Sequence, residues 1–319
     1  MKTYRMKFLT CIVSLFIFQA GQCCINEYRA LLNGEIVMGD EGYGAPHGRF
    51  DIHDKEYLQN RLHYIDSMYK VTGSIQDYSD LGTMLVFDGQ YIRAKKIFQE
   101  IEIKSPGLYN TAANLGTTYE LLGQNDSAYF WIKKAMKINP ESHQGSEWIH
   151  LKILEAKIKS KGDASYFQTH NILGLDFGTD EIPLNKNPID LNTLCQQLYN
   201  QLNERITFIK PKDPIVAQLL VDFGNASAIA TDVTSALEIY ESAKEYGYYS
   251  DLFEKRYAYF KSLQAKADTR NEAEKAARGF FNKNPIGTLL ILVSIVIVVV
   301  AAVIFLFIRI RKKRIKAKK

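Results

Sequence analysis

The chain has 319 residues, 46% hydrophobic and 24% charged, a composition typical of a folded globular protein of one or two domains. The net charge of +5 is unevenly spread, because 11 of the 40 basic residues lie in the first seven and the last eleven positions. The other 29 basic residues are outnumbered by 35 acidic ones. This balance of about −6 argues against a body that binds nucleic acid.

Residues 1–23 have the layout of a secretory signal peptide: a basic start, an apolar run from Phe8 to Phe18 and then small residues. Three outcomes remain open here: ordinary cleavage, cleavage with a lipid on Cys23 or Cys24, and an uncleaved anchor. Cys195 is the lone cysteine of the body, so no internal disulfide framework can form. We expect its side chain to be a buried structural thiol.

Residues 24–70 are predicted to form a glycine-rich loop followed by a helix. Asp54 is a plausible N-cap, and the apolar face of the helix consists of Tyr57, Leu58, Leu62, Ile65 and Tyr69. His47 and His53 lie in the loop with Asp51 and Asp54, but their spacing matches no common zinc pattern.

A repeat with a period of 34 residues occupies 75–108 and 109–142, within a predicted unit of 71–161. Seven positions are identical in the two copies: Leu81 and Leu115, Gly82 and Gly116, Thr83 and Thr117, Gly89 and Gly123, Gln90 and Gln124, Ala94 and Ala128, and Pro106 and Pro140. The copies also match in apolar type at Leu85 and Tyr119, Phe98 and Ile132, and Ile101 and Ala135. This spacing predicts two helices in each copy.

The Leu-Gly, Tyr, Ala and Pro pattern resembles the tetratricopeptide repeat. The resemblance implies an all-α solenoid of antiparallel helix pairs. We expect Gly82 and Gly116 to lie where the two helices cross, opposite Ala94 and Ala128. Gly89 and Gly123 should then close the first helices, and Pro106 and Pro140 should stop the second ones.

After Pro140, residues up to 161 are predicted to form a capping helix with Trp148, Leu151, Ile153 and Leu154, and with His150 at its surface or edge. Residues 162–189 are interpreted as a linker or an ordered crossing. Residues 190–283 form a second helical region, with Asp190 as a helix cap, a degenerate repeat at about 214–247 and a charged stalk.

The stretch 286–308 contains 23 residues without a charge, long enough for one transmembrane helix, with a long buried core helix as the alternative. Eight of the eleven residues of 309–319 are basic, which predicts a cytoplasmic tail that is a topology signal or a binder of anionic lipid. The body is then expected outside the cytoplasm, on the periplasmic side in a Gram-negative cell.

In tetratricopeptide proteins the first helix of each repeat lines a groove that binds peptides or partner helices. The repeat register places ten residues of this sequence at the corresponding groove positions. These groove residues are Gln76, Ser79, Thr83, Val86, Asn110, Ala113, Thr117, Glu120, Gln144 and Glu147. Ser79 and Thr83 stand where a carboxylate-gripping clamp would carry Lys and Asn, so that clamp is not expected.

The sequence predicts a membrane-anchored, extracytoplasmic scaffold that binds another envelope or membrane protein or a peptide, without catalysis, cofactor, metal or nucleic acid. One alternative is an envelope hydrolase or glycan-acting enzyme that uses His47, His53 and nearby acids. Another is an adaptor whose body lies inside the cytoplasm. The pattern identifies neither the partner nor the oligomeric state.

Overall fold

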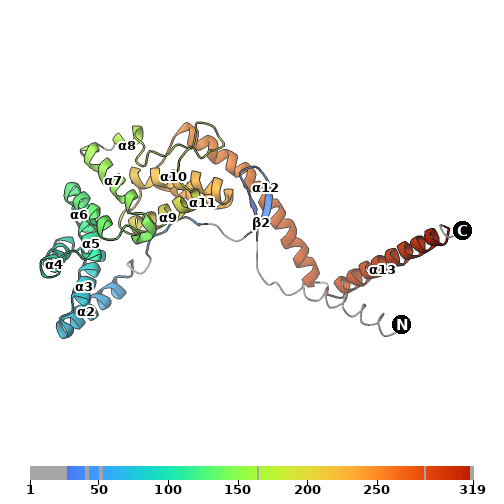
Figure 1. The fold of residues 1–319 in the computed structure, drawn as a ribbon, viewed down its shortest axis with the longest axis horizontal. Helices are drawn as coiled ribbons and strands as arrows, with labels where there is room; N and C mark the ends of the chain where they lie inside the picture. Colours follow the sequence, from blue (N-terminus) through green and yellow to red (C-terminus); the bar gives the residue numbers. More distant parts are fainter. Residues whose placement is uncertain (1–26, 40–42, 50–52, 164, 284, 317–319) are drawn as a thin grey trace. The chain divides into compact units, whose positions relative to one another are not determined.

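The computed structural model describes residues 27–39, 43–49, 53–163, 165–283 and 285–316, so the expected signal peptide at 1–23 lies outside the described residues. Two compact units follow one another in the chain, Met1–Ala265 and Lys266–Lys319, and each is described by itself. The described chain is mostly helical and has only one two-stranded sheet, which confirms the all-α class (Figure 1).

The helices follow the expected order along the chain. They are α2 (Lys55–Thr72), α3 (Ile75–Phe87), α4 (Tyr91–Lys104), α5 (Tyr109–Leu121), α6 (Asn125–Ile138), the 3-10 helix η3 (Ser142–Gly145), α7 (Glu147–Ser160), α8 (Tyr166–Thr169), α9 (Leu191–Phe208), α10 (Pro214–Ala230), α11 (Val233–Glu245), α12 (Asp251–Lys283) and α13 (Pro285–Lys316). Asp54 and Asp190 cap α2 and α9, each accepting a backbone N–H of the first turn through its side chain.

A short β-hairpin precedes these helices, in a region for which the sequence predicts only loop. Strands β1 (Glu27–Ala30) and β2 (Ile36–Gly39) pair antiparallel. Arg29 of β1 is buried and donates to Asp232 and Ser235 at the start of α11, at 3.4 Å in each case. The loop prediction is wrong here because this hairpin is held by a distant helix, and its four-residue strands carry little pattern of their own.

The two repeat copies form two helical hairpins, α3–α4 and α5–α6, whose helices begin 34 residues apart (Figure 1). Gly89 and Gly123 adopt left-handed φ angles of 76° and 73° directly after the first helix of each hairpin. Gly89 N–H donates to Val86 O and Gln90 N–H to Leu85 O, and the second copy repeats both bonds, which is the Schellman arrangement. The helices α4 and α6 each end two residues before Pro106 and Pro140.

Each hairpin has one point where a glycine lies directly against a side chain of the second helix. A Cβ on Gly82 would lie 2.7 Å from the Phe98 ring, and one on Gly116 would lie 2.5 Å from Ile132 Cγ1. The partner is therefore the apolar residue four positions after the alanine that the sequence analysis placed opposite the glycine. The close contact explains why a helix accepts glycine, which costs about 1 kcal/mol relative to alanine.

The hairpin α10–α11 repeats this contact in the degenerate third copy, where a Cβ on Gly224 would lie 2.5 Å from Tyr240 Cε1. Tyr240 is fully buried, and its ring packs against Phe253 and Phe260 of α12, with ring centroids 4.6 and 5.3 Å apart. The first part of α12, expected to be a stalk, is thus a packed layer over this hairpin.

The segment between α8 and α9 is held on the body by Arg256 of α12. Its guanidinium donates to the carbonyl oxygens of Phe177, Gly178 and Asp180 and to Asn225 Oδ1, at 2.8–2.9 Å. Ile172, Leu173 and Phe177 are buried as well. The segment is therefore an ordered crossing that packs on the helices.

The expected capping helix begins late. The 34-residue period places its start at 143 (109 + 34), but residues 143–145 adopt left-handed φ angles of 50°, 59° and 68°, and α7 begins only at Glu147. Gln144, expected on this helix, lies instead in η3. Its carbonyl and side-chain oxygens accept hydrogen bonds from Gln197 and Asn200 of α9.

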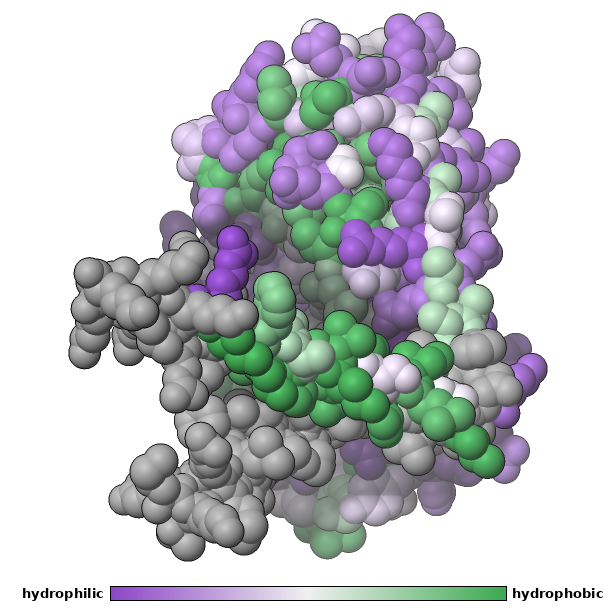
Figure 2. Space-filling model, turned by 90° about the vertical axis from the view of Figure 1, so that its right-hand side faces the viewer, coloured by the Kyte–Doolittle hydropathy of each residue, from purple (hydrophilic) through white to green (hydrophobic). Residues whose placement is uncertain are grey.

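In the second unit, the apolar stretch 286–308 is helical within α13. Apolar side chains along this helix, such as Val298 and Phe305, are exposed, and Figure 2 shows a band of apolar residues on the molecular surface. Across the described part of the chain, no helix was found that is long and apolar enough to cross a membrane. The assignment of this stretch to a membrane stays a prediction.

We predict that Gly224→Ala lowers the free energy of unfolding by about 1–3 kcal/mol, because the new methyl group would overlap the buried Tyr240 ring. Thermal or denaturant unfolding of the full chain measures this. The matched control is Gly279→Ala, a helical site where a Cβ would meet no atom within 4 Å. A gain in stability for Gly224→Ala, the usual result of this change in a free helix, would contradict the close contact.

Candidate functional site

A cavity of about 360 Å³ lies between α3, α5, α7 and α9, within the usual range for ligand pockets of about 300–1,000 Å³. Seven of the ten groove residues proposed from the sequence line it: Thr83, Val86, Asn110, Ala113, Thr117, Glu120 and Glu147. The other three are Gln76, exposed on α3; Ser79, buried in the same helix; and Gln144, in η3. The structure therefore brings most of the predicted set to one place.

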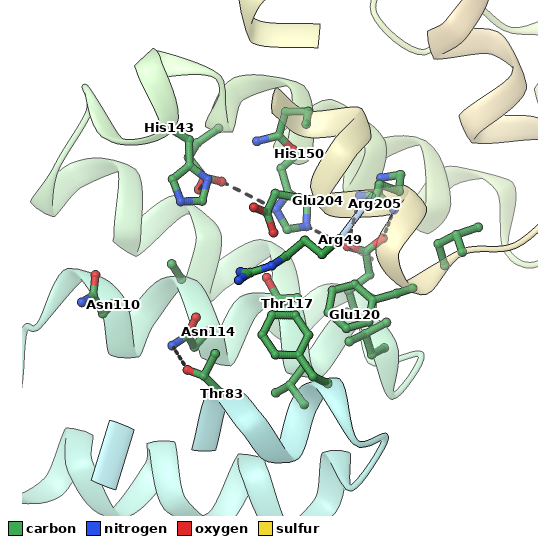
Figure 3. A pocket seen from close by; sticks show the side chains of 18 of the residues that line it. Arg49, Thr83, Asn110, Asn114, Thr117, Glu120, His143, His150, Glu204 and Arg205 are labelled. Carbon is green, nitrogen blue, oxygen red and sulfur yellow. Dashed lines mark hydrogen bonds and ion pairs between the residues drawn. The ribbon is translucent and has the colours of Figure 1, made fainter. Parts of the chain in front are cut away.

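One side of the cavity is neutral and polar. Asn110, Asn114 and Thr117 come from α5 and Thr83 from α3, with Asn114 Nδ2 donating to Thr83 Oγ1 at 3.2 Å (Figure 3). Thr83 and Thr117 hold the same position in the two repeat copies. Side chains of this kind offer hydrogen-bond donors and acceptors, as a peptide backbone requires, without a titrating group.

The opposite side contains a buried ion cluster centred on Glu120 of α5. Its carboxylate accepts from Arg205 of α9 at 2.8 and 3.3 Å, from Lys157 of α7 at 2.6 Å, and it pairs with His150 Nε2 of α7 at 2.7 Å (Figure 3). The side chains of Glu120, His150 and Arg205 are each less than 10% exposed. One carboxylate thereby joins three helices that are far apart in the sequence.

The charges in this cluster shift the pKa of both partners. Burial by itself would raise the pKa of Glu120, but the charges of Arg205, His150 and Lys157 outweigh burial and hold it well below the ordinary 4.5. Burial would likewise lower the pKa of His150, but the charge and hydrogen bond of Glu120 and the nearby carboxylate of Glu147 raise it above 6.5. Both groups are therefore charged in weakly acidic solution.

A second carboxylate, Glu147 of α7, extends the cluster toward η3 and the start of α5. Tyr109 donates to its Oε1 at 3.2 Å, while His143 Nδ1 lies 3.5 Å from Oε1 and His150 Nδ1 lies 3.6 Å from Oε2. Burial would raise the pKa of Glu147, but its interaction with His150, the charge of His143 and the hydrogen bond from Tyr109 keep it below 4.5. Burial raises the pKa of Tyr109 to about 12, so this hydroxyl stays protonated.

The sequence analysis missed several members of this site. It placed His150 at the surface or edge of the helix, and the surface position is wrong, because the residue is only 7% exposed and lies between two glutamates. Arg205 and Lys157 stand among other polar residues on their helices, so no local signal sets them apart. Glu120 was expected only as a groove residue, so no sequence signal pointed to the cations that surround its buried carboxylate.

Other candidate groups lie outside this cavity. Cys195 is fully buried and its pKa is raised by burial to about 12, which fits a structural thiol rather than a nucleophile. The backbone N–H of His47 donates to Asn203 Oδ1, while His53 Nε2 lies 3.2 Å from Lys210 Nζ. The described residues contain no group of three or more His, Cys, Asp or Glu side chains placed to hold a metal ion. Asp51 lies outside them.

We predict that Glu120→Gln lowers the free energy of unfolding by about 3–5 kcal/mol near neutral pH, because three cations lose their shared carboxylate. Denaturant unfolding measures the loss. Glu155→Gln is the control, since Glu155 lies on α7 in a more exposed pair with Lys152 and should change stability by less than about 1 kcal/mol. Equal losses of stability for the two variants would show that the ion cluster contributes no more to folding than an exposed ion pair does.

We also predict that the stability gained from His150 shrinks as pH rises. A histidine whose folded pKa exceeds its unfolded pKa of about 6.5 stabilises fully below that value, and the contribution is lost as pH passes the folded pKa. The difference in unfolding free energy between the native chain and His150→Gln, measured from pH 5.5 to 8.5, should fall. Buried Asp222, with a pKa raised to about 8, is present in both proteins and largely cancels from this difference. A stability difference between the two proteins that grows with pH would contradict a raised pKa for His150.

No family model and no curated protein matches this sequence. Among solved structures, the chain is similar to the crystal structure of BtubC (BKLC) from P. vanneervenii, with 12% identity and a TM-score of 0.29. The match covers 70% of this chain and 91% of that one. At this TM-score we draw no conclusion from the similarity.

Proposed function

We propose that this chain is a tetratricopeptide-type scaffold that holds a peptide segment of another protein in the cavity between α3, α5, α7 and α9. The observation that carries the proposal is that seven residues chosen by repeat register line this one cavity. The recurring helix starts, glycine caps and glycine contacts of α3–α4 and α5–α6 support the repeat assignment.

The polar side of the cavity suits a peptide backbone. Asn110, Asn114, Thr83 and Thr117 are uncharged and partly accessible or exposed, so a bound chain exchanges water for their donors and acceptors at little desolvation cost. The ion cluster on the other side fixes α5, α7 and α9 against one another. A wall that is rigid before binding reduces the entropy lost when a ligand is held.

We further propose that α13 anchors the chain in a membrane, with the body outside the cytoplasm and residues 309–319 inside. The support is the uncharged stretch 286–308 and the eight basic residues that follow it. A reporter fused after residue 270 tests the orientation. Activity of a reporter that works only outside the cytoplasm is expected, and activity of a cytoplasmic reporter would favour the internal adaptor.

The cavity assignment predicts a position-dependent crosslink in cells. A photo-reactive amino acid at Thr117 should give a discrete crosslinked product, whereas one at exposed Lys133 of α6 should not give that product. Asn110→Trp, which places bulk at an exposed wall of the cavity, should remove the product from the Thr117 variant. A product that survives Asn110→Trp, or its absence at Thr117 with normal protein levels, would count against the cavity as the binding site.

A further inference from the structure

Glu147 is the buried charge of the cavity whose partners leave it incompletely neutralised. The residue is 3% exposed, yet its Oε2 atom is buried and accepts no hydrogen bond, the nearest ring nitrogen of His150 being 3.6 Å away. Its other oxygen accepts only from Tyr109, a neutral hydroxyl. A buried, ionised carboxylate with an unfilled acceptor is costly, so Glu147 would gain from a further positive charge supplied from outside the chain.

The charges of the cavity are separated along its length. Arg205, Lys157 and His150 all converge on Glu120, whose carboxylate is fully occupied. No lysine or arginine of the described residues forms an ion pair with Glu147, which has only the two histidines. One end of the cavity therefore has three cations that are already engaged with Glu120, and the other end has a carboxylate whose charged partners are histidines. Arg49 lines the cavity as well, and its guanidinium lies 5.0 Å from the centre of the Phe87 ring.

A second acid adds to the negative end. Glu204 of α9 is exposed and lines the same cavity. Burial is the main cause of the raised pKa of Tyr109, and the negative charges of Glu147 and Glu204 add to it. Two carboxylates, Glu147 of α7 and Glu204 of α9, therefore contribute negative charge at this end of the cavity. Tyr109 and His143 complete this end with an edge-to-face pair of rings whose centroids are 6.4 Å apart. Aromatic rings beside carboxylates favour an organic cation over an inorganic one.

We propose that the peptide held in the cavity carries a lysine or arginine side chain, which lies between Glu147 and Glu204 and beside the rings of Tyr109 and His143. This assignment rests on the proposed function and names its ligand more closely. The cation of the ligand pairs with the carboxylates of Glu147 and Glu204, while the adjoining backbone lies along Asn110 and Asn114. An acidic side chain at the same place would meet two carboxylates, so the site excludes it.

The experiment uses the full-length chain in detergent and four pools of nonapeptides with randomised flanks. The central residue is fixed as lysine, arginine, norleucine or glutamate, where norleucine keeps the length of lysine without its charge. We expect the lysine or the arginine pool to be retained about tenfold more than the norleucine pool at low salt, and less so at high salt. The glutamate pool should be retained least.

Variants then assign the preference to the two acids. Glu147→Gln should abolish the selection for a cationic centre, and Glu204→Gln, at an exposed position, should reduce it without a risk to folding. Glu155→Gln on the same helix as Glu147 lies outside this cavity and should leave the selection unchanged. Equal retention of the pools, a preference for glutamate, or a cationic preference that survives both Glu147→Gln and Glu204→Gln would overturn the proposal.

The two proposals fail in different ways. If the Thr117 crosslink forms and is blocked by Asn110→Trp, but the pools show no cationic preference, the cavity binds a partner and only the charge assignment is wrong. If the crosslink is absent and all pools are retained equally, both the peptide-binding role and the charge assignment are wrong.

Discussion

The close contact between a glycine and a side chain sixteen residues later is the constraint on which this helical architecture depends. It occurs at Gly82 with Phe98, at Gly116 with Ile132 and at Gly224 with Tyr240. In each case the partner occupies the space that a Cβ would fill, so the two helices of a hairpin can meet in one way only. The contacts thus fix α3 against α4 and α5 against α6, and other residues of α3 and α5, such as Thr83 and Thr117, line the cavity.

The ion cluster solves a different problem, which is how to join the repeat hairpins to the helices that follow. Burying Glu120 is unfavourable by itself, and two basic side chains and a histidine from α7 and α9 offset that cost. A hydrophobic contact of the same size would hold the helices with less geometric demand. The carboxylate, by contrast, requires Arg205 and His150 at defined positions, and so determines the shape of the cavity wall next to it.

Much of the fold could be predicted because its determinants are local. A 34-residue period, two glycine caps and two prolines define the bounds of four helices, and each signal lies within the helix or turn that it controls. The cavity could be predicted in part, since residues at equal repeat positions face the same way on stacked helices. Thr83 and Thr117 show this directly.

What could not be predicted depends on long-range contacts. Arg205 lies 85 residues from Glu120, and nothing around it in the sequence distinguishes it from other arginines on a helix face. The hairpin β1–β2 depends on Asp232, about two hundred residues away. The late start of α7 depends on His143 and Gln144 in left-handed conformations, which glycine favours and these residues rarely adopt, so only Gly145 gave a sign of the break.

The location of the glycine contacts has a consequence for how such a chain can change in length. Each contact lies inside one hairpin, so a hairpin is self-contained, and a duplicated copy would bring its own contact with it. The bonds of Glu120 instead connect the hairpin α5–α6 to α7 and α9, outside that hairpin. An extra hairpin inserted after α6 would separate Glu120 from both helices. The glycines therefore make the hairpins interchangeable in principle, while this one carboxylate fixes how many of them stand between α5 and the rest of the chain.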